Sequence, residues 1–473
     1  MKKLFLLAAF SVLFISTSIT AQQKRTITLN EAIQLALENN YQLKQAENNL
    51  DLAEYRILSE KADFLPSLNA SLNGSRNTGN QFNNNTGNFV NETIYGVGGG
   101  LNTSLVIFSG FENINSLRAS EQDKISSEES LRRAKETVIF NTASSYLQVL
   151  LDQQLLEISR SNLETSRNLL EQIKAQVEVG SRPSVDQYNQ EAQVANDELQ
   201  VTNSENALSL SKLRLVRQLQ IDPLLEYEFQ LPNFDTEDFG DENYMLADLV
   251  DQALITRSDI RSEQANIKSL KLREKIAKSA LMPSLSLNGG LNSSANDNTD
   301  EPVIIGFEND GTPIFERDNE GNVVTTPVSF NDQFFDRNIR TSLTLNLSVP
   351  IFNKLNRSLG IQQAEVQYKN AQLSLENTEL QVIQEVTQAN NDYSSVIKQL
   401  EASEKSLIAS RKAFETQQER YNVGASTLIE LSQAQTNFVQ AQSNRTQALY
   451  NLIFQEKLLD YYVGKLSGDD VEF

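Results

Sequence analysis

The sequence has 473 residues, with 41 Lys and Arg against 62 Asp and Glu, and a formal net charge of −21 at pH 7. Such a chain repels nucleic acid, so we expect no nucleic-acid partner. It contains no Cys and no His, which removes disulfides, thiolate nucleophiles, the commonest general base and the commonest metal ligand. We therefore expect no enzyme activity, no cofactor and no metal site.

The first 21 residues have the pattern of a secretory signal peptide. Lys2 and Lys3 precede an apolar run from Leu4 to Ile15, and Ala21 stands before the expected cleavage point. A membrane anchor is the alternative, but a run of about a dozen apolar residues is too short to span about 30 Å of hydrocarbon. We expect the mature chain to enter the periplasm.

The mature chain is internally duplicated. Pro66, within Leu65-Pro66-Ser67-Leu68, recurs as Pro283, within Met282-Pro283-Ser284-Leu285, 217 positions later. Ile107-Phe108 recurs as Ile351-Phe352, and Val179-Gly180 as Val423-Gly424, both 244 positions later. We predict a first repeat at 22–219, a linker segment at 220–244, a second repeat at 245–464 and an acidic tail at 465–473. Each repeat should contain a helix, two strands, a long helix, a tight turn and a returning helix.

Four segments, two in each repeat, alternate apolar with small polar residues, which predicts strands: Ser67–Asn73, Leu101–Ile107, Ser284–Leu291 and Ser342–Ile351. Their length and composition suit membrane strands with apolar residues outward and polar residues inward, although a half-buried sheet in a soluble domain would alternate in the same way. Aromatic residues near their ends suit a girdle at the membrane interface, namely Phe64, Tyr95, Phe108, Phe335 and Phe352.

Four strands cannot close a barrel, because barrels begin at about eight strands and open edges cannot face lipid. We therefore expect several copies of the chain to contribute strands to one barrel in outer-membrane lipid. The polar stretches Asn73–Glu92 and Ser293–Asn338 are predicted to be extracellular loops. The turns Asp310-Gly311 and Asp318–Gly321 lack the spacing of a calcium-binding EF-hand, so hairpin turns are favoured.

Long helices are predicted from about Glu112 to Val179 and from about Asn353 to Val423, each on the order of 100 Å long. The second helix carries a seven-spaced apolar row, which is Val386, Tyr393, Leu400, Leu407, Phe414 and Tyr421. The first helix has a matching row, which is Val149, Leu156, Leu163, Leu170 and Val177. An earlier row is out of phase with it, namely Leu359, Val366, Leu373 and Leu380. These rows are typical of coiled coils.

Each long helix should end at a glycine, Gly180 or Gly424, in the left-handed conformation. Pro183 and Ser184, or Ser426 and Thr427, then begin the returning helix. Asp186 and Glu430 fall in its first turn, where the helix dipole favours a carboxylate. Capping alone would explain both acids, and the alternative is a ring of carboxylates that narrows a channel.

One segment of the second repeat resembles the hairpin-tip motif of the TolC family of outer-membrane factors. It reads Arg420-Tyr421-Asn422-Val423-Gly424-Ala425-Ser426-Thr427-Leu428-Ile429-Glu430-Leu431, and Gln176–Asp186 echoes it in the first repeat. The similarity covers nearly the whole mature chain, from Leu29 to about Gly464. It implies a mainly α fold with transmembrane β strands: a homotrimer in which four strands per chain form one twelve-stranded β-barrel, continued by an α-helical coiled-coil barrel.

The resemblance implies an outer-membrane channel that reaches into the periplasm and passively conducts substrates in tripartite efflux or type I secretion. The partners that it implies are a periplasmic adaptor protein and an inner-membrane pump of the RND, ABC or MFS class. The linker segment would correspond to the family's belt around the tunnel, and a solvated acidic linker is the alternative.

The resemblance also assigns residues at the tips. Glu430 matches the first of two acids, three residues apart, that line the periplasmic constriction in the family, but the second position is the neutral Gln433. The arginine that latches the closed state matches Ser426, so Arg182 in the first repeat is an alternative latch residue. Contacts to the adaptor carry over to Gly180 and Gly424, with Arg182, Val423 and Ser426 beside them.

Two other functions remain open. A periplasmic structural coiled-coil protein that links envelope layers would need the heptads and the signal peptide but no alternating strands. The adaptor itself would show one helical hairpin flanked by small β modules, whereas this chain has two matched hairpins.

Overall fold

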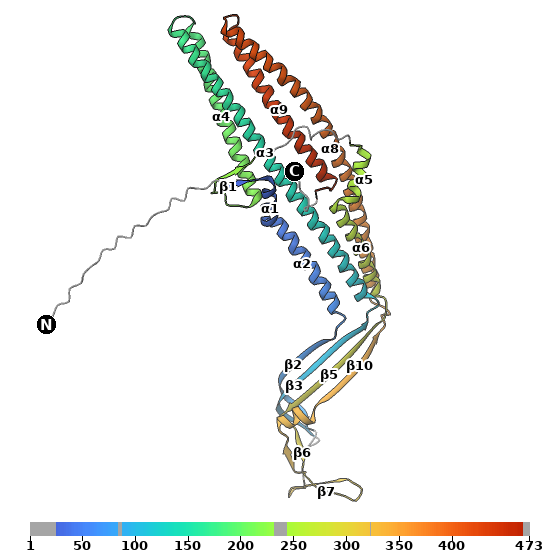
Figure 1. The fold of residues 1–473 in the computed structure, drawn as a ribbon. Coiled ribbons are helices and arrows are strands. Elements are labelled where there is room, and N and C mark those ends of the chain that lie inside the picture. The colour runs from blue at the N-terminus through green and yellow to red at the C-terminus, as the bar shows by residue number, and fades with distance from the viewer. Residues whose placement is uncertain (1–24, 84–87, 231–243, 322, 467–473) are drawn as a thin grey trace, which may run out of the picture. The chain divides into compact units, whose positions relative to one another are not determined.

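The computed structural model describes residues 25–83, 88–230, 244–321 and 323–466 (Figure 1). The predicted signal peptide, the middle of the linker at 231–243 and the end of the acidic tail at 467–473 lie outside these ranges. The chain divides into two compact units. Residues 49–128 and 262–376 form the second unit, the first unit holds the rest, and each takes segments from both repeats.

The helices repeat with the two offsets found in the sequence. Helices α1 (Leu29–Asn39) and α2 (Tyr41–Ala62) correspond to α5 (Leu246–Thr256) and α6 (Ser258–Ser279), 217 positions later. Helices α3 (Glu112–Glu178) and α8 (Asn356–Asn422) have 67 residues each and lie 244 positions apart. Helices α4 (Ser184–Leu219) and α9 (Leu428–Tyr462) also begin 244 positions apart. The predicted duplication and the two long helices are confirmed.

The backbone repeats as well, even where the residue type differs. Gly110 and Phe111, between strand and long helix, have φ values of 66° and 69°, and their counterparts Lys354 and Leu355 have 44° and 64°. Positive φ is uncommon outside glycine. At Gly110 a Cβ atom would lie 2.7 Å from the Cβ of Met282, so only the first repeat needs glycine there.

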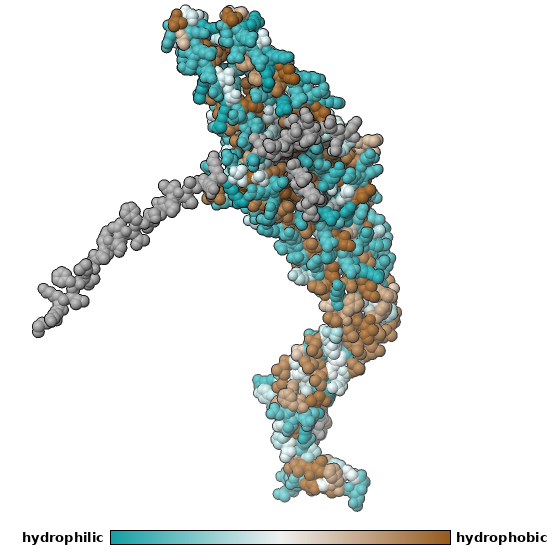
Figure 2. Space-filling model, viewed as in Figure 1, coloured by the Kyte–Doolittle hydropathy of each residue, from teal (hydrophilic) through white to brown (hydrophobic). Residues whose placement is uncertain are grey.

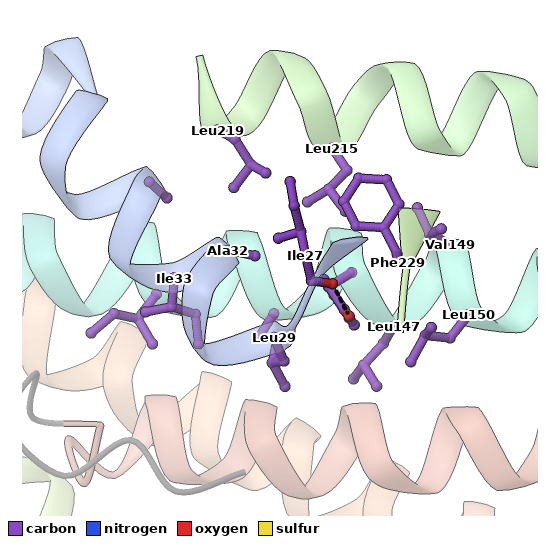
Figure 3. Packing of buried hydrophobic residues seen from close by; sticks show 14 of the residues in the cluster. Ile27, Leu29, Ala32, Ile33, Leu147, Val149, Leu150, Leu215, Leu219 and Phe229 are labelled. Atoms are coloured by element: carbon purple, nitrogen blue, oxygen red, sulfur yellow. Dashed lines mark hydrogen bonds between the residues drawn. The ribbon is translucent and has the colours of Figure 1, made fainter. Parts of the chain in front are cut away.

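The core of the first unit surrounds Tyr146 of α3. Strand β1 (Arg25–Ile27) pairs in parallel with β4 (Tyr227–Phe229). The Tyr146 hydroxyl lies 2.9 Å from the carbonyl oxygen of Ile27 and 2.7 Å from that of Gln230, and burial raises the pKa of Tyr146 to about 12. Figure 3 shows Ile27 and Phe229 between side chains of α3 and α4. Within the described start of the predicted linker, Phe229 is therefore part of a packed core, whereas residues 222–226 are exposed.

The seven-spaced rows differ in burial. Tyr393 and Tyr421 of the later row in α8 are buried, as are Val149 and Leu163 of the matching row in α3. The earlier, out-of-phase row is exposed in the single chain, at 52% for Leu359, 53% for Val366, 61% for Leu373 and 67% for Leu380. The phase break therefore separates an apolar row that packs within the chain from one that does not.

The second unit contains a four-stranded antiparallel sheet with the order β10-β5-β3-β2. Its strands are β2 (Ser67–Asn83), β3 (Asn88–Phe108), β5 (Ser284–Asn296) and β10 (Arg340–Ser348). Within the described residues, β10 and β2 are edge strands with one partner each. The four predicted strands are confirmed.

Their predicted bounds are partly wrong. Most of the predicted loop Asn73–Glu92 is strand, because β2 and β3 form a long hairpin. Strand β10 ends at Ser348 rather than Ile351, since Pro350 has no N–H group to donate to a ladder.

The predicted loop Ser293–Asn338 contains secondary structure of its own. It holds the short strands β6 (Asp300–Pro302), β7 (Ile304–Phe307), β8 (Pro313–Phe315) and β9 (Thr325–Pro327), then α7 (Phe330–Asp332) and the π-helical turn η1 (Gln333–Arg337). Among the helices that the structure describes, none is both long enough and apolar enough to cross a membrane.

Candidate functional site

Both helical hairpins end in turns of the same geometry. Gly180 and Gly424 have φ values of 74° and 75°. The N–H of Gly180 donates to Val177 O and that of Ser181 to Gln176 O, and the second turn repeats both hydrogen bonds 244 positions later. This is the Schellman arrangement, which satisfies the last carbonyls of a helix. The predicted left-handed conformation is confirmed at both glycines.

Each tip exposes two apolar side chains. Val179 and Val423, before the glycines, are 78% and 79% exposed. Val185 and Ile429, in the returning helices, are 55% and 74% exposed. Val423 is among the predicted contact residues, whereas Val179, Val185 and Ile429 were missed, although apolar residues at equivalent positions beside both turns were a usable signal. The two tips thus present similar apolar surfaces to solvent.

Glu430 is held in a capping box at the start of α9. Its N–H donates to Thr427 Oγ1 at 3.3 Å, and the N–H of Thr427 donates to Glu430 Oε2 at 2.9 Å. The Ser426 hydroxyl donates to the same carboxylate oxygen at 2.8 Å. These bonds, first that from the Thr427 backbone, hold the pKa of the Glu430 carboxyl below its usual value. The capping role is therefore observed, and the role at a constriction stays a prediction.

Gln433, one turn further along α9, belongs to an exposed row of amides. Its Nε2 donates to Asn437 Oδ1 at 3.0 Å, and Gln440 donates to Asn444 in the same way at 2.8 Å. Asn437, Gln440 and Asn444 were not predicted, although the seven-residue spacing of the two glutamines and of the two asparagines is visible in the sequence. This face of α9 is neutral beyond Glu430, so it offers hydrogen bonds rather than further charges.

Arg182 joins the two hairpin tips. Its guanidinium carbon lies 4.1 Å from the ring centre of Tyr421, and its Nη1 lies 3.6 Å from Asp186 Oδ2. Tyr421 is 3% exposed, and its burial raises the pKa of its hydroxyl. It packs with Leu169, Ile173, Leu428 and Leu431. Ser426, the match to the family's latch arginine, contacts Glu430 instead. Arg182 is a cation of the first tip that contacts a residue of the second hairpin, and its role as a latch stays a prediction.

The register of the sheet sorts its side chains onto two faces, because directly opposed residues share a face. One face carries rows such as Leu345–Leu287–Leu105 and Thr341–Leu291–Leu101–Ala70. The other carries Thr344–Asn288–Ser104–Ser67 and Ser342–Gly290–Asn102–Asn69. Leu343 and Leu68 on the first face are 77% and 72% exposed, and Figure 2 shows apolar residues gathered over parts of this sheet. The predicted alternation is confirmed.

The predicted girdle aromatics lie at two levels of the sheet. Phe64, Phe108 and Phe352 stand where the strands adjoin the helices. Tyr95 is opposite Arg76, and Phe335 lies in η1 rather than at a strand end.

Between these levels the strands carry no charge: 67–75, 96–108, 284–296 and 341–348 contain no Asp, Glu, Lys or Arg. Nine residues of strand at about 3.3 Å each, tilted by about 40°, rise about 23 Å. This is close to the apolar band of about 25 Å in membrane barrels. In the part of the chain that the structure describes, no cluster of acidic residues could hold a metal ion.

Comparison with known proteins identifies the same architecture. The chain is 26% identical to the outer membrane protein TolC of Vibrio cholerae over 452 residues, covering 94% of this chain and 92% of that protein. It is 24% identical to the pyoverdine export outer membrane protein OpmQ of Pseudomonas aeruginosa over 436 residues, covering 89% and 81%. The fold matches the CmeC outer membrane channel of Campylobacter jejuni with a TM-score of 0.75 at 20% identity, covering 93% of this chain and 87% of that one.

The sequence model of the outer membrane efflux protein family matches residues 32–219 and 249–465, which is most of the chain and both halves of the duplication. This chain, with its two matched hairpins and its four-stranded sheet, therefore belongs to the outer membrane efflux protein family.

Proposed function

We propose that three copies of this chain form a passive channel that crosses the outer membrane and continues through the periplasm, without catalysis, cofactor or metal. The observation that carries the proposal is a sheet with two open edges, one apolar face and one polar face. An apolar face of this kind needs lipid, and open edges need further strands. A structural coiled-coil protein between envelope layers would need neither.

The open edges support closure by copies of the same chain. Strand β2 begins just after α2, whereas β10 ends just before α8, so the two edges run in opposite directions. The β2 edge of one copy can therefore pair in antiparallel fashion with the β10 edge of the next. Three copies supply twelve strands, above the minimum of about eight for a barrel.

The helices that adjoin these edges support the same arrangement. In α2, Leu52, Tyr55 and Leu58 are exposed, at 65%, 66% and 59%. In α8, the apolar residues Leu359, Val366 and Leu373 are exposed and are spaced seven residues apart. Neighbouring copies that join β2 to β10 would bring α2 of one copy against α8 of the next. Both apolar faces would then be covered in a coiled-coil contact.

The polar faces would line the conduit. The sheet offers hydrogen bonds but few charges through its rows of serine, threonine and asparagine. Helix α9 does the same through its amide row, which is Gln433, Asn437, Gln440 and Asn444. Glu430, one in each of three copies, would form a carboxylate ring at the periplasmic mouth. Arg182, held by Asp186 and Tyr421, would take the place of the family's latch arginine.

The exposed tips would meet a periplasmic adaptor. Val179, Val185, Val423 and Ile429 surround two glycine turns of equal geometry, so one adaptor surface could recognise either tip. Through the adaptor the channel would serve an inner-membrane pump of the RND, ABC or MFS class. The relative OpmQ is named for pyoverdine export, which supports an export role for this chain.

Cysteine cross-linking tests the trimer directly, because the chain has no cysteine of its own. Asn69→Cys on β2 would be combined in turn with Ser342→Cys, Thr344→Cys and Asn346→Cys on β10. Oxidation in membranes should give covalent dimers and trimers for at least one pair, and purified protein should conduct ions across planar bilayers. The control pair Val106→Cys and Ser286→Cys, opposed within one sheet, should cross-link inside the monomer. A stable monomer with a folded sheet and no conductance would refute the proposal.

A further inference from the structure

The segment α7–η1 is fastened onto the sheet by hydrogen bonds. The Ser293 hydroxyl donates to Phe334 O at 2.5 Å, and Asn338 Nδ2 donates to Ser294 O at 2.6 Å. The Gln333 side chain, 1% exposed, accepts from Asn296 N–H at 3.0 Å and donates to Asn296 O at 2.8 Å. Residues 293–296 of strand β5 therefore hold the segment through several hydrogen bonds. These bonds fix the position of the segment on the sheet.

The sheet makes room for this segment at Gly99. A Cβ atom there would lie 2.8 Å from Phe334 Cζ and 3.3 Å from Leu72 Cδ1. Gly99 is opposite Leu72 and Ser293, so Phe334 lies on the face that carries the leucine rows. Phe335 stacks edge-on against Phe334, with 5.1 Å between ring centres, and is 71% exposed. The segment thus forms a raised aromatic wall on the apolar face.

A groove of about 350 Å³ runs beside this wall. Its floor is formed by Ala70, Leu72, Leu101 and Leu291 from three strands, and its wall by Phe335 and Ile339. No charged side chain lines it. Within the charge-free band, an apolar groove with a floor and a wall buries more of an extended hydrocarbon than a flat strand surface does.

We propose that this groove binds one acyl chain of an outer-leaflet lipid, an inference that rests on the proposed outer-membrane channel. The groove is continuous with the apolar face that would contact lipid, and it lies at the loop-bearing end of the strands, which an outward-facing barrel places in the outer leaflet. A second copy of the chain is a poorer occupant, because copies meet at the β2 and β10 edges whereas the groove is centred on β3.

The absence of tryptophan from the chain provides the test. Phe335→Trp places one indole over the groove, and Leu345→Trp places one on the same apolar face away from it. Detergent-solubilised trimer is titrated with phosphatidylcholine that carries a dibrominated acyl chain, which quenches a nearby indole. If the groove adds the burial of about two methylenes, the Phe335→Trp protein is half-quenched at a roughly tenfold lower lipid ratio than the Leu345→Trp protein.

A filled groove provides the matched control. Ala70→Phe, added to Phe335→Trp, should abolish the difference, whereas Leu68→Phe, on the same strand and face but outside the groove, should preserve it. Equal quenching of the two reporters, or a preference that survives Ala70→Phe, would overturn the proposal. Trimer mass and ion conductance are measured on every variant, so an intact channel without preferential quenching rejects the lipid site alone. Loss of the trimer in the unsubstituted chain would instead reject the proposed function.

Discussion

At the residue scale, Arg182 is the side chain that we propose as a latch in place of the family's arginine. The position in the second repeat that matches the family's latch arginine holds Ser426. The hydroxyl of Ser426 donates a hydrogen bond to the Glu430 carboxylate. Arg182, in the first repeat, contacts the ring of Tyr421 in the other hairpin and also faces Asp186. A cation over an aromatic ring contributes about 0.5 to 2 kcal/mol, depending on how far it is desolvated.

Replacing this cation should favour opening of the tips. Arg182→Ala should weaken the closed state by about 1 kcal/mol, which changes the ratio of open to closed channels roughly fivefold. Single-channel recording in planar bilayers measures that ratio. Arg182→Lys should recover part of the effect, while Arg167→Ala, which removes an exposed pair with Glu198, should leave gating unchanged. Identical recordings for Arg182→Ala and the unsubstituted channel would exclude Arg182 as a latch.

The capping box gives the second tip a defined response to pH. Hydrogen bonds from Thr427 and Ser426 lower the pKa of Glu430 from its usual value of 4.5. A carboxyl with a lowered pKa in the folded state contributes stability above 4.5, and this contribution is lost as the pH falls through the lowered value. Corrected for intrinsic rates, amide exchange in peptides around Thr427 should stay slow from pH 7 to 5 and accelerate only below the usual value. Glu430→Gln should remove this acid dependence, and acceleration already between pH 7 and 6 would contradict the assignment.

At the scale of elements, the equal length of α3 and α8 is a packing constraint. The helices have 67 residues each, and buried rows from both meet α4 and α9 in the cores around Leu170 and Tyr421. One added residue rotates everything beyond it by about 100° around the helix and turns the apolar row away from its partners.

A single Ala inserted after Leu163 should therefore reduce the yield of assembled trimer severalfold, as measured by native gel electrophoresis of membrane extracts. Five residues inserted after Asp310, in the exposed turn between β7 and β8, should be tolerated, because no packed row continues through that turn. Similar yields from both insertions would argue against a coiled coil with fixed register.

At the scale of the whole molecule, one chain leaves apolar surface that only further copies and lipid can cover. Leu373 on α8 is 61% exposed in the single chain, in the row that we assign to a contact between copies. Burying a leucine contributes about 1.5 to 3 kcal/mol, and a carboxylate at the same place would have to be desolvated as well.

Leu373→Asp should therefore shift detergent-extracted protein from trimer towards monomer in sedimentation velocity experiments. Gln367→Glu adds the same charge at another exposed position, about 120° round the helix from Leu373, and should leave the trimer intact. A stable trimer of the Leu373→Asp protein would show that this row faces solvent or another partner.

Several features of this protein were determined by sequence alone, because they depend on spacing along the chain. The two offsets predicted the helix pairs, the alternation predicted four strands, and Gly180 and Gly424 predicted left-handed turns, all local or periodic properties. Strand ends were predicted wrongly, since the Asn- and Gly-rich composition at 73–92 resembles a loop and only pairing between β2 and β3 makes it a sheet.

The tertiary structure decided which distant side chains meet. Arg182 lies on Tyr421, and Phe334 lies on Gly99, although each pair is separated by more than two hundred residues. Spacing cannot reveal such contacts, because they depend on how helices and strands far apart in sequence are placed against each other. The exposure of the row at Leu373 was equally hidden, since its period matches that of the buried row and only packing distinguishes them.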